Sequence, residues 1–198
     1  MVKKSEIVYA FIDSQNLNLG VKNSIKNKSG KGLRYKGWNL DFKKLYIYLK
    51  ENLKVSKAFI FIGYVPDNQN LYTSLQKDGY ILVFKPTLVR NNGGKKEIKG
   101  NVDAELVLHT MLEIQNYDKA VIVAGDGDYY CLVEYLAENN RLSKIVIPNM
   151  LSYSSLLRKY SRYFKYMNDL KGKLEYRGDK NEKEGLSQGR NLEHALLS

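Results

Sequence analysis

The sequence predicts an α/β fold, a three-layer sandwich in which helices cover both faces of a mostly parallel, five-stranded, Rossmann-like sheet. Short apolar runs rich in β-branched and aromatic residues recur along the 198-residue chain, as in strands that are buried on both faces. Segments with helical spacing of apolar residues separate these runs. Because strand and helix patterns alternate from one end to the other, parallel strands joined by helical crossovers are expected.

Five strands and five helices follow from this pattern. The strands are expected over Ile7 to Ile12, Val55 to Ile62, Tyr80 to Phe84, Ala120 to Ala124 and Lys144 to Ile147. The helices are expected over Asn39 to Leu53, Asn68 to Lys77, Val102 to Ile114, Tyr129 to Glu138 and Ser152 to Phe164. Asn39 is a candidate N-cap for the first helix, and Gly79 is expected to close the second.

Individual side chains are assigned from the same helical spacing. The third helix is expected to bury one apolar face, made of Ala104, Val107, Leu108, Met111 and Leu112. His109 then falls beside Glu105 and Glu113, which predicts a surface histidine rather than a ligand. Cys131, the single cysteine, lies in an apolar stretch and is expected to be a packed thiol that forms no disulfide within the chain.

One domain is expected over residues 1–170, followed by a polar, loosely ordered tail over 171–198. Two long connections interrupt the domain, Ser14 to Trp38 and Pro86 to Gly100. Connections of this length in a compact domain are usually functional or mobile. The first contains no acidic residue and six basic ones, namely Lys22, Lys26, Lys28, Lys31, Arg34 and Lys36.

The charge balance indicates a polyanionic partner. The chain carries 32 lysines and arginines against 21 acidic residues, for a formal charge of +11. Such an excess favours nucleic acid first and an acidic membrane surface second, while the alternative is a protein with many surface lysines. No apolar stretch approaches the roughly 18 residues of a membrane helix. A cytoplasmic protein without a membrane partner is therefore expected, and the oligomeric state, a homodimer included, is left open.

Four aspartates follow the strands in a pattern that predicts a metal site. Asp13 ends the first strand, Asp126 and Asp128 follow the fourth, and Asp103 lies near the start of a helix after the third. The carboxyl ends of parallel strands open on one rim, so these side chains are expected to converge. Carboxylates in close proximity oppose folding unless a cation lies between them. Hard oxygen ligands suit Mg²⁺ or Mn²⁺.

Each aspartate also has a purely structural interpretation. Asp13 could cap a turn at the end of its strand, and Asp103 could be favoured by the helix dipole in a first turn. Asp126 and Asp128 could form a glycine-rich turn in which one of them caps the next helix. The coincidence of all four on one rim favours the functional interpretation.

Three segments around these aspartates resemble the NYN domain family, a branch of the PIN-like nucleases, and its bacterial LabA-like members in particular. They are Phe11-Ile12-Asp13-Ser14-Gln15-Asn16, Lys99-Gly100-Asn101-Val102-Asp103 and Gly125-Asp126-Gly127-Asp128-Tyr129. The resemblance covers roughly residues 7–164. The sequence departs from the usual pattern at Ser14-Gln15, at Asn101 and at Gly127, where serine is frequent in the family. None of these departures removes a carboxylate.

The resemblance implies a PIN-like fold and a metal-dependent ribonuclease. Asp13, Asp103 and Asp126 would hold the metal, and Asp128 would ligate a second ion or orient water. Asn16 would steady the first aspartate or contact the substrate. Other classes fit less well, because Gln15 stands where a HAD-type phosphatase needs a second aspartate. No Gly-x-Gly-x-x-Gly turn for a dinucleotide follows the first strand.

Basic residues outside the aspartate segments are candidates for RNA contacts. Lys99 lies four residues before Asp103 and is a candidate for the scissile phosphate, unless it is an ordinary loop lysine. Arg158, Lys159 and Arg162 alternate with tyrosines, a combination suited to single-stranded RNA. The alternative is an amphipathic helix whose charged face is solvated.

The sequence therefore predicts hydrolysis of phosphodiester bonds in single-stranded or structured RNA, with Mg²⁺ or Mn²⁺ held by the aspartates. The alternative is an RNA-binding or regulatory module with little turnover, in which the carboxylates are retained for metal binding and shape.

Overall fold

The computed structural model describes residues 5–86, 88–92, 95–99 and 101–178, with the backbone alone described for 88–92 and 95–99. Its centre is a six-stranded parallel sheet in the order β10-β9-β8-β1-β4-β5. The strands are β1 (Val8–Asp13), β4 (Val55–Tyr64), β5 (Ile81–Pro86), β8 (Lys119–Val123), β9 (Leu142–Ile147) and β10 (Phe164–Tyr166). The α/β class and all five expected strands are confirmed, while the count of five is wrong.

The sixth strand lies at the end of a segment that was expected to be a helix. Residues Ser155–Tyr163 form the 3₁₀ segment η3, and β10 follows it directly. In β10, Phe164 pairs with Ile145 and Tyr166 with Ile147. Three half-buried residues are too short a run to show the two-residue period of a strand, so the spacing of the preceding tyrosines dominated the sequence pattern.

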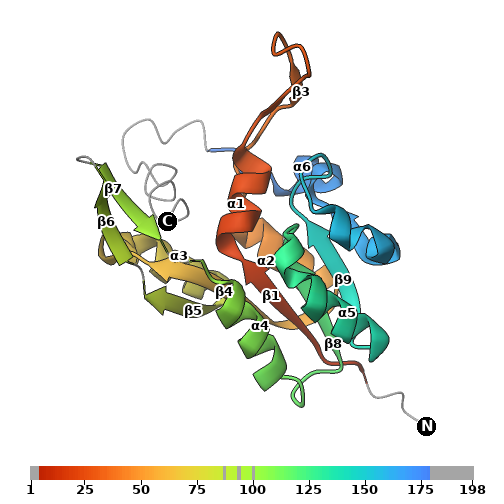
Figure 1. Cartoon of the computed structure of the whole chain (residues 1–198). Coiled ribbons are helices and arrows are strands. Elements are labelled where there is room, and N and C mark those ends of the chain that lie inside the picture. Colours follow the sequence, from red (N-terminus) through yellow and green to blue (C-terminus); the bar gives the residue numbers. More distant parts are fainter. Residues whose placement is uncertain (1–4, 87, 93–94, 100, 179–198) are drawn as a thin grey trace.

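Helices cover both faces of the sheet (Figure 1). They are α1 (Ser14–Lys22), α2 (Phe42–Asn52), α3 (Gln69–Asp78), α4 (Asp103–Leu112), α5 (Tyr130–Glu138) and α6 (Lys171–Leu174), with short 3₁₀ turns η1 (Pro66–Asn68), η2 (Gly127–Tyr129) and η4 (Met167–Leu170). Side chains alternate along β1 between two core layers. Ala10 and Ile12 pack with α1, α2 and α3, whereas Tyr9 and Phe11 face α4 and α5.

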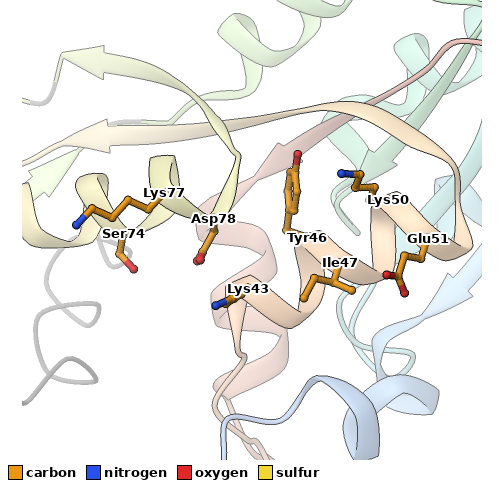
Figure 2. A pocket seen from close by; sticks show the side chains of 8 residues that line it. All are labelled: Lys43, Tyr46, Ile47, Lys50, Glu51, Ser74, Lys77 and Asp78. Carbon is orange, nitrogen blue, oxygen red and sulfur yellow. The ribbon is translucent and has the colours of Figure 1, made fainter.

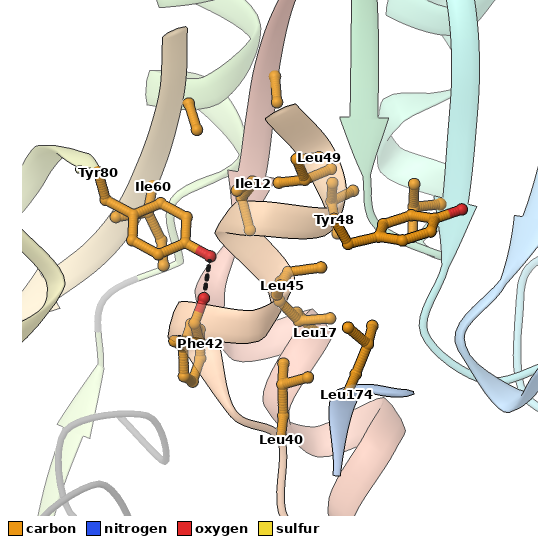
Figure 3. Packing of buried hydrophobic residues seen from close by; sticks show 14 of the residues in the cluster. Ile12, Leu17, Leu40, Phe42, Leu45, Tyr48, Leu49, Ile60, Tyr80 and Leu174 are labelled. Atoms are coloured by element: carbon orange, nitrogen blue, oxygen red, sulfur yellow. Dashed lines mark hydrogen bonds between the residues drawn. The ribbon is translucent and has the colours of Figure 1, made fainter. Parts of the chain in front are cut away.

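The first core layer is shown in Figure 3, where Leu45 and Leu49 of α2 meet Ile12 and Ile60 of the sheet. Within it, the Tyr80 hydroxyl donates a 2.8 Å hydrogen bond to the carbonyl of Phe42 (Figure 3). The hydroxyl of this buried tyrosine therefore has a hydrogen-bond partner, as buried polar groups usually do.

Helix ends were predicted with mixed success. Gly79 ends α3 in a left-handed conformation with φ of +108°, as expected. The N-cap of α2 is Asp41, whose carboxylate accepts from the amide of Lys44, and not Asn39. Aspartate and asparagine are similarly good N-caps, so sequence alone does not separate candidates two residues apart.

The two long connections contain more regular structure than expected. The first consists of α1 and an antiparallel hairpin of β2 (Ile25–Lys26) and β3 (Leu33–Tyr35). The second contains an antiparallel hairpin of β6 (Leu88–Asn92) and β7 (Lys95–Lys99). In Figure 1 the β2–β3 hairpin projects beyond α1, away from the sheet.

The folded region continues past Leu170. Leu174 in α6 is buried in the first core layer. The Lys44 ammonium donates to the carbonyl of Glu175, and the amide of Tyr176 donates to Asn39. Residues 171–176 therefore belong to the fold and not to the expected tail, and residues 179–198 lie outside the described part of the chain.

The predicted buried face of α4 is correct only in part, because Val107 and Met111 pack against the core whereas Ala104, Leu108 and Leu112 are exposed. Leu108 is 60 % exposed and Leu112 is 68 % exposed, whereas Leu106 and Thr110 are buried. His109 was expected at the surface, but its ring lies 5.0 Å from the ring of Phe59 and its Nε2 is buried. Cys131, expected to be packed, is exposed because α5 turns its neighbours Leu132 and Val133 toward the sheet.

Among the residues described, none of the helices combines the length and apolar character required to cross a membrane.

Candidate catalytic carboxylate site

Asp13 is placed by both the strand that it ends and the helix that it caps. It shares the facing of Phe11 in β1, so its side chain points toward the layer of α4 and α5. Its Oδ1 accepts a 2.9 Å hydrogen bond from the amide of Asn16 in the first turn of α1. The side chain is only 5 % exposed. Asp13 is thus a buried carboxylate held in a fixed orientation.

Tyr129 connects Asp13 to Asp103. This tyrosine ends η2 and is fully buried. Its hydroxyl oxygen lies 2.8 Å from Asp13 Oδ2 and 2.6 Å from Asp103 Oδ1. The two carboxylate oxygens are therefore at most 5.4 Å apart, the sum of these distances. The expected proximity of Asp13 and Asp103 is confirmed, through a tyrosine that the sequence did not single out.

The three oxygens need two protons between them. A phenol hydroxyl has one proton and can donate it to only one of the two carboxylates. The second short contact is a hydrogen bond only if the other carboxyl is protonated and donates to the tyrosine oxygen. Burial, with a smaller contribution from the charge of Asp103, raises the pKa of Asp13 to about 6 against the opposing effects of the Asn16 amide and the Tyr129 hydroxyl. A retained proton at Asp13 is consistent with this geometry.

Asp126 and Asp128 add two further carboxylates next to Asp103. The negative charges of Asp126 and Asp103 raise the pKa of Asp128, which is exposed on the rim. Asp126 also caps η2, because its Oδ1 lies 3.2 Å from the amide of Asp128. The contacts form a row, which we call the carboxylate row: Asp13, Asp103, Asp128 and Asp126.

The carboxylate row is not a preformed cage. Among the residues that the structure describes, no three aspartate, glutamate, histidine or cysteine side chains are gathered closely enough to hold one ion. Part of the reason is Tyr129, whose hydroxyl occupies the position between Asp13 and Asp103. The predicted sharing of ions by Asp13, Asp103 and Asp126 stays a prediction.

Asn16 connects two of the segments that carry the aspartates. Its side-chain oxygen accepts a 2.8 Å hydrogen bond from the amide of Gly125, while its own amide donates to Asp13. The start of α1 is thereby fixed to the turn that follows β8. Of the two roles that the resemblance implied, these contacts support the steadying of Asp13.

Asp103 is positioned by residues before and beside it. The Asn101 side-chain oxygen accepts a 3.0 Å hydrogen bond from the amide of Asp103, which orients the first turn of α4. Lys85, at the end of β5, contacts the Asn101 carbonyl and forms a 2.9 Å ion pair with Glu105. The sequence analysis did not identify Lys85, although its place at the end of a strand was a signal. Lys99 lies in β7, and its side chain is outside the description.

Comparison with known proteins identifies the family. The model of the NYN domain matches residues 8–168. The chain belongs to the NYN domain family. This family consists of PIN-like nuclease domains, so membership supports a function related to RNA cleavage.

Two known proteins are similar to this NYN domain. One is the low amplitude and bright protein LabA from Synechococcus elongatus, 23 % identical over 146 residues that cover 70 % of this chain and 78 % of LabA. The other is the crystal structure of a protein of unknown function from Vibrio parahaemolyticus. It has a TM-score of 0.61 and 20 % identity, and the match covers 85 % of this chain and 98 % of that one. The structural match shows the fold alone.

The turn between the two rim aspartates is closely packed in this NYN domain. A Cβ on Gly127 would lie 2.4 Å from the hydroxyl oxygen of Ser154, and the Ser154 amide donates a 2.8 Å hydrogen bond to Gly125. Ser154 therefore occupies the space that a serine at position 127, frequent in the family, would need.

We expect Gly127→Ser to lower the free energy of unfolding by about 1–3 kcal/mol, the usual cost of overpacking. The measurement is a double-mutant cycle in urea with Ser154→Gly, which removes the contacting side chain. The two changes should be coupled, with the double variant more stable than the sum of the single effects predicts. Additive effects would show that the two positions do not compete for space.

The basic residues of η3 differ in whether their charged groups already have partners within the protein. Lys159 forms a 2.7 Å ion pair with Glu134, and its ammonium lies over the rings of Tyr130 and Tyr160. Arg162 stacks on the ring of Tyr163 with its Cζ 4.8 Å from the ring centre. Arg158 is exposed. Contact of Lys159 with an RNA phosphate would require its ion pair to break, so Arg158 and Arg162 are the stronger candidates.

One pocket lies away from the carboxylate row, between α2 and α3 (Figure 2). It has a volume of about 540 Å³ and mixed charge, and its lining residues are Lys43, Tyr46, Ile47, Lys50, Glu51, Ser74, Lys77 and Asp78. None of the predicted site residues lines it. We assign it no part in the chemistry of the rim.

Proposed function

We propose that this NYN domain is a metal-dependent ribonuclease that hydrolyses RNA phosphodiester bonds at the carboxylate row. The observation that carries the proposal is the pair of Asp13 and Asp103, whose oxygens lie within 5.4 Å of each other on opposite sides of one hydroxyl. Asp128 and Asp126 continue the negative charge outward. Such an arrangement opposes folding when no cation is present, which is typical of a site kept for function.

The donor set suits a hard divalent cation. Asp13, Asp103 and Asp126 would hold Mg²⁺ or Mn²⁺, because both ions prefer carboxylate oxygens, and Asp128 would ligate a second ion or orient water. A bound ion of this kind supplies activation of water and stabilisation of charge on phosphate during an in-line displacement. The rim faces of Asp126 and Asp128 are accessible from solvent, since both are less buried than Asp13.

The chain's own residues orient the carboxylates, hold protons between them and neutralise RNA phosphates. The Asn16 amide fixes the Asp13 carboxylate, and the Tyr129 hydroxyl donates its own proton to one of the two carboxylates, Asp13 or Asp103. Release of the second proton, which is retained on the other carboxyl, would leave both carboxylates charged and ready for a cation. Arg158, Arg162 and Lys99 are the residues we assign to RNA phosphates, in keeping with the formal charge of +11.

The test is cleavage of an end-labelled single-stranded RNA with Mg²⁺ or Mn²⁺, with and without EDTA. We expect cleavage that depends on the added ion and stops with the chelator. The same preparation with Asp103→Asn serves as the control for a contaminating nuclease. Cleavage that persists in EDTA, or that Asp103→Asn leaves unchanged, would contradict the proposal.

A second function is supported by the row itself, because the described residues bring no three ligands together. The domain would then bind RNA as a regulatory module without turnover. RNA binding that survives EDTA, together with no cleavage under any added ion, is the outcome that would select this function.

A further inference from the structure

We propose that the β2–β3 hairpin, residues Ser24–Gly37, is an RNA-docking arm that contacts the phosphate backbone at a distance from the carboxylate row. We call this hairpin the basic arm. The inference rests on the proposed function in one respect, namely that the ligand is RNA. It adds a second contact region, and it predicts that long RNA is preferred over short RNA.

The basic arm carries only one sign of charge. Its five charged residues are all cationic, namely Lys26, Lys28, Lys31, Arg34 and Lys36. Within the described part of the chain, none of the five forms an ion pair with a carboxylate. Unpaired cations on a projecting element are available to neutralise phosphates, and each phosphate contact releases counterions.

The arm is an ordered structure although it buries little. Of its two aliphatic side chains, Leu33 is 57 % exposed and Ile25 is half-buried. The tip is closed by Asn27, whose amide donates 2.8 Å to the Gly32 carbonyl and whose side chain accepts from the Ser29 hydroxyl. Gly30 adopts the positive φ of +72° that the turn requires. Core packing is confined to the base of the arm, where Tyr35 packs against the first core layer, and it does not account for the order of the tip.

The base of the arm is fixed to α1. The carbonyl of Val21 accepts from both the Tyr35 hydroxyl, at 2.7 Å, and the Trp38 amide, at 3.2 Å. A Cβ on Gly37 would lie 1.7 Å from the Lys22 carbonyl oxygen, so only glycine permits the two chain segments to approach this closely. These contacts hold the hairpin in one direction relative to the helix.

The same helix connects the arm to the carboxylate row. Asp13 caps the N-terminus of α1, and the arm leaves its C-terminus after nine residues. At about 1.5 Å per residue, the helix separates the two by roughly 13 Å. The arm extends for roughly another 17–20 Å, given about 3.3 Å per residue. Figure 1 shows the arm beyond the end of α1 that is remote from β1. An RNA strand must be long to reach both regions.

Membrane lipid is a less suitable ligand than RNA. A segment that binds the membrane interface usually combines basic residues with large apolar side chains that insert, tryptophan and phenylalanine among them. The arm contains neither of these, its one exposed large aliphatic side chain is Leu33, and Ile25 is half-buried at its base. Electrostatic attraction without insertion points to a soluble polyanion.

The test measures binding without chemistry. Fluorescence anisotropy in EDTA would compare RNA of about 6 and about 30 nucleotides, since single-strand sites span about 4–16 nucleotides. The arm variant combines Lys26→Gln, Lys28→Gln, Lys31→Gln and Arg34→Gln. The matched control combines Lys43→Gln, Lys50→Gln, Lys54→Gln and Lys77→Gln. All eight side chains are exposed, and both variants lose the same charge.

We expect the arm variant to bind the long RNA more weakly and with a lower salt dependence. For four phosphate contacts, the slope of log K against log salt should fall by up to about 3. The short RNA should bind the two variants alike, and the control should retain the slope of the unmodified protein. An equal loss in both variants would assign the effect to net charge and overturn the proposal, as would an unchanged slope.

Two further measurements distinguish this inference from its alternatives. Loss of binding to phosphatidylserine vesicles, with RNA binding intact, would assign the arm to a membrane and overturn the proposal. Because these measurements use EDTA, binding that depends on the arm stands even if no cleavage is ever found. Conversely, equal rates of cleavage by the unmodified protein and the arm variant, for RNA of each length, would exclude the basic arm from RNA docking. That result would leave the proposed ribonuclease function intact.

Discussion

Asp126→Asn is expected to lower the rate of RNA cleavage by on the order of 10²–10³, the usual cost of removing one electrostatic group from a reaction site. The swap preserves the size of the side chain and its role as cap of η2, where Oδ1 accepts from the Asp128 amide. It removes one negative charge from the carboxylate row. Metal affinity should fall with that charge, and the raised pKa of Asp128 should move toward its ordinary value because Asp126 is the main cause of the shift.

The same variant should be at least as stable as the unmodified protein in the absence of metal. Fewer like charges on the rim mean less repulsion in the folded state. The measurement pairs cleavage with Mn²⁺ and thermal unfolding in EDTA on one preparation. A structural role for Asp126 predicts the reverse, a lower Tm and unchanged cleavage per folded molecule. Full cleavage by a normally folded variant would exclude Asp126 from the chemistry.

Asp13→Asn is expected to stabilise the metal-free protein in a pH-dependent manner. The pKa of Asp13 rises from 3.8 to about 6 in the fold, mainly because the carboxyl is buried. A group whose pKa is raised by folding contributes stability below its unfolded pKa and loses that contribution as the pH rises through the folded value. The unmodified protein should therefore lose roughly 3 kcal/mol from this group between pH 4 and pH 7. Asparagine does not titrate and still serves as an N-cap for α1.

The measurement is urea unfolding of both proteins in EDTA from pH 4 to pH 8. The difference in unfolding free energy should be small at pH 4 and should grow by roughly 3 kcal/mol toward pH 7.5 in favour of Asp13→Asn. Saturating Mg²⁺ or Mn²⁺ should reduce that advantage if the ion binds the unmodified carboxylate. A difference that does not vary with pH would mean that folding does not raise the pKa of Asp13.

The sheet and its rim were accessible to sequence reasoning for a simple physical reason. Strands that are buried on both faces must be apolar along their whole length, so β1, β4 and β8 stand out against their surroundings. The polar residues that follow such strands are then conspicuous, and Asp13 and Asp126 were found in this way. Because the carboxyl ends of parallel strands lie at the same edge of a sheet, these aspartates were expected to lie close together.

Two kinds of feature could not be predicted from the sequence: the rotation of a helix about its axis, and contacts between residues that are distant along the chain. In α4, apolar residues lie on more than one face, and the sequence pattern favoured Leu108 and Leu112 over the face that carries His109. On that face, the His109 ring packs against the rings of Phe59 and Phe61. Tyr129 was missed because one tyrosine among sixteen carries no signal of its own. Only the three-dimensional meeting of β1, α4 and η2 gives its hydroxyl two carboxylate partners.

The chain leaves the domain body and returns to it at almost the same point, because Lys22 and Gly37 cross in direct contact and Val21 binds Trp38. Because its ends adjoin, the length of this insertion can change at only a small entropic cost. The hairpin is therefore an exchangeable module. Hairpins of other lengths and charges could be transplanted onto the same helix end without moving Asp13, so the surface of the arm can change while the carboxylates remain in place.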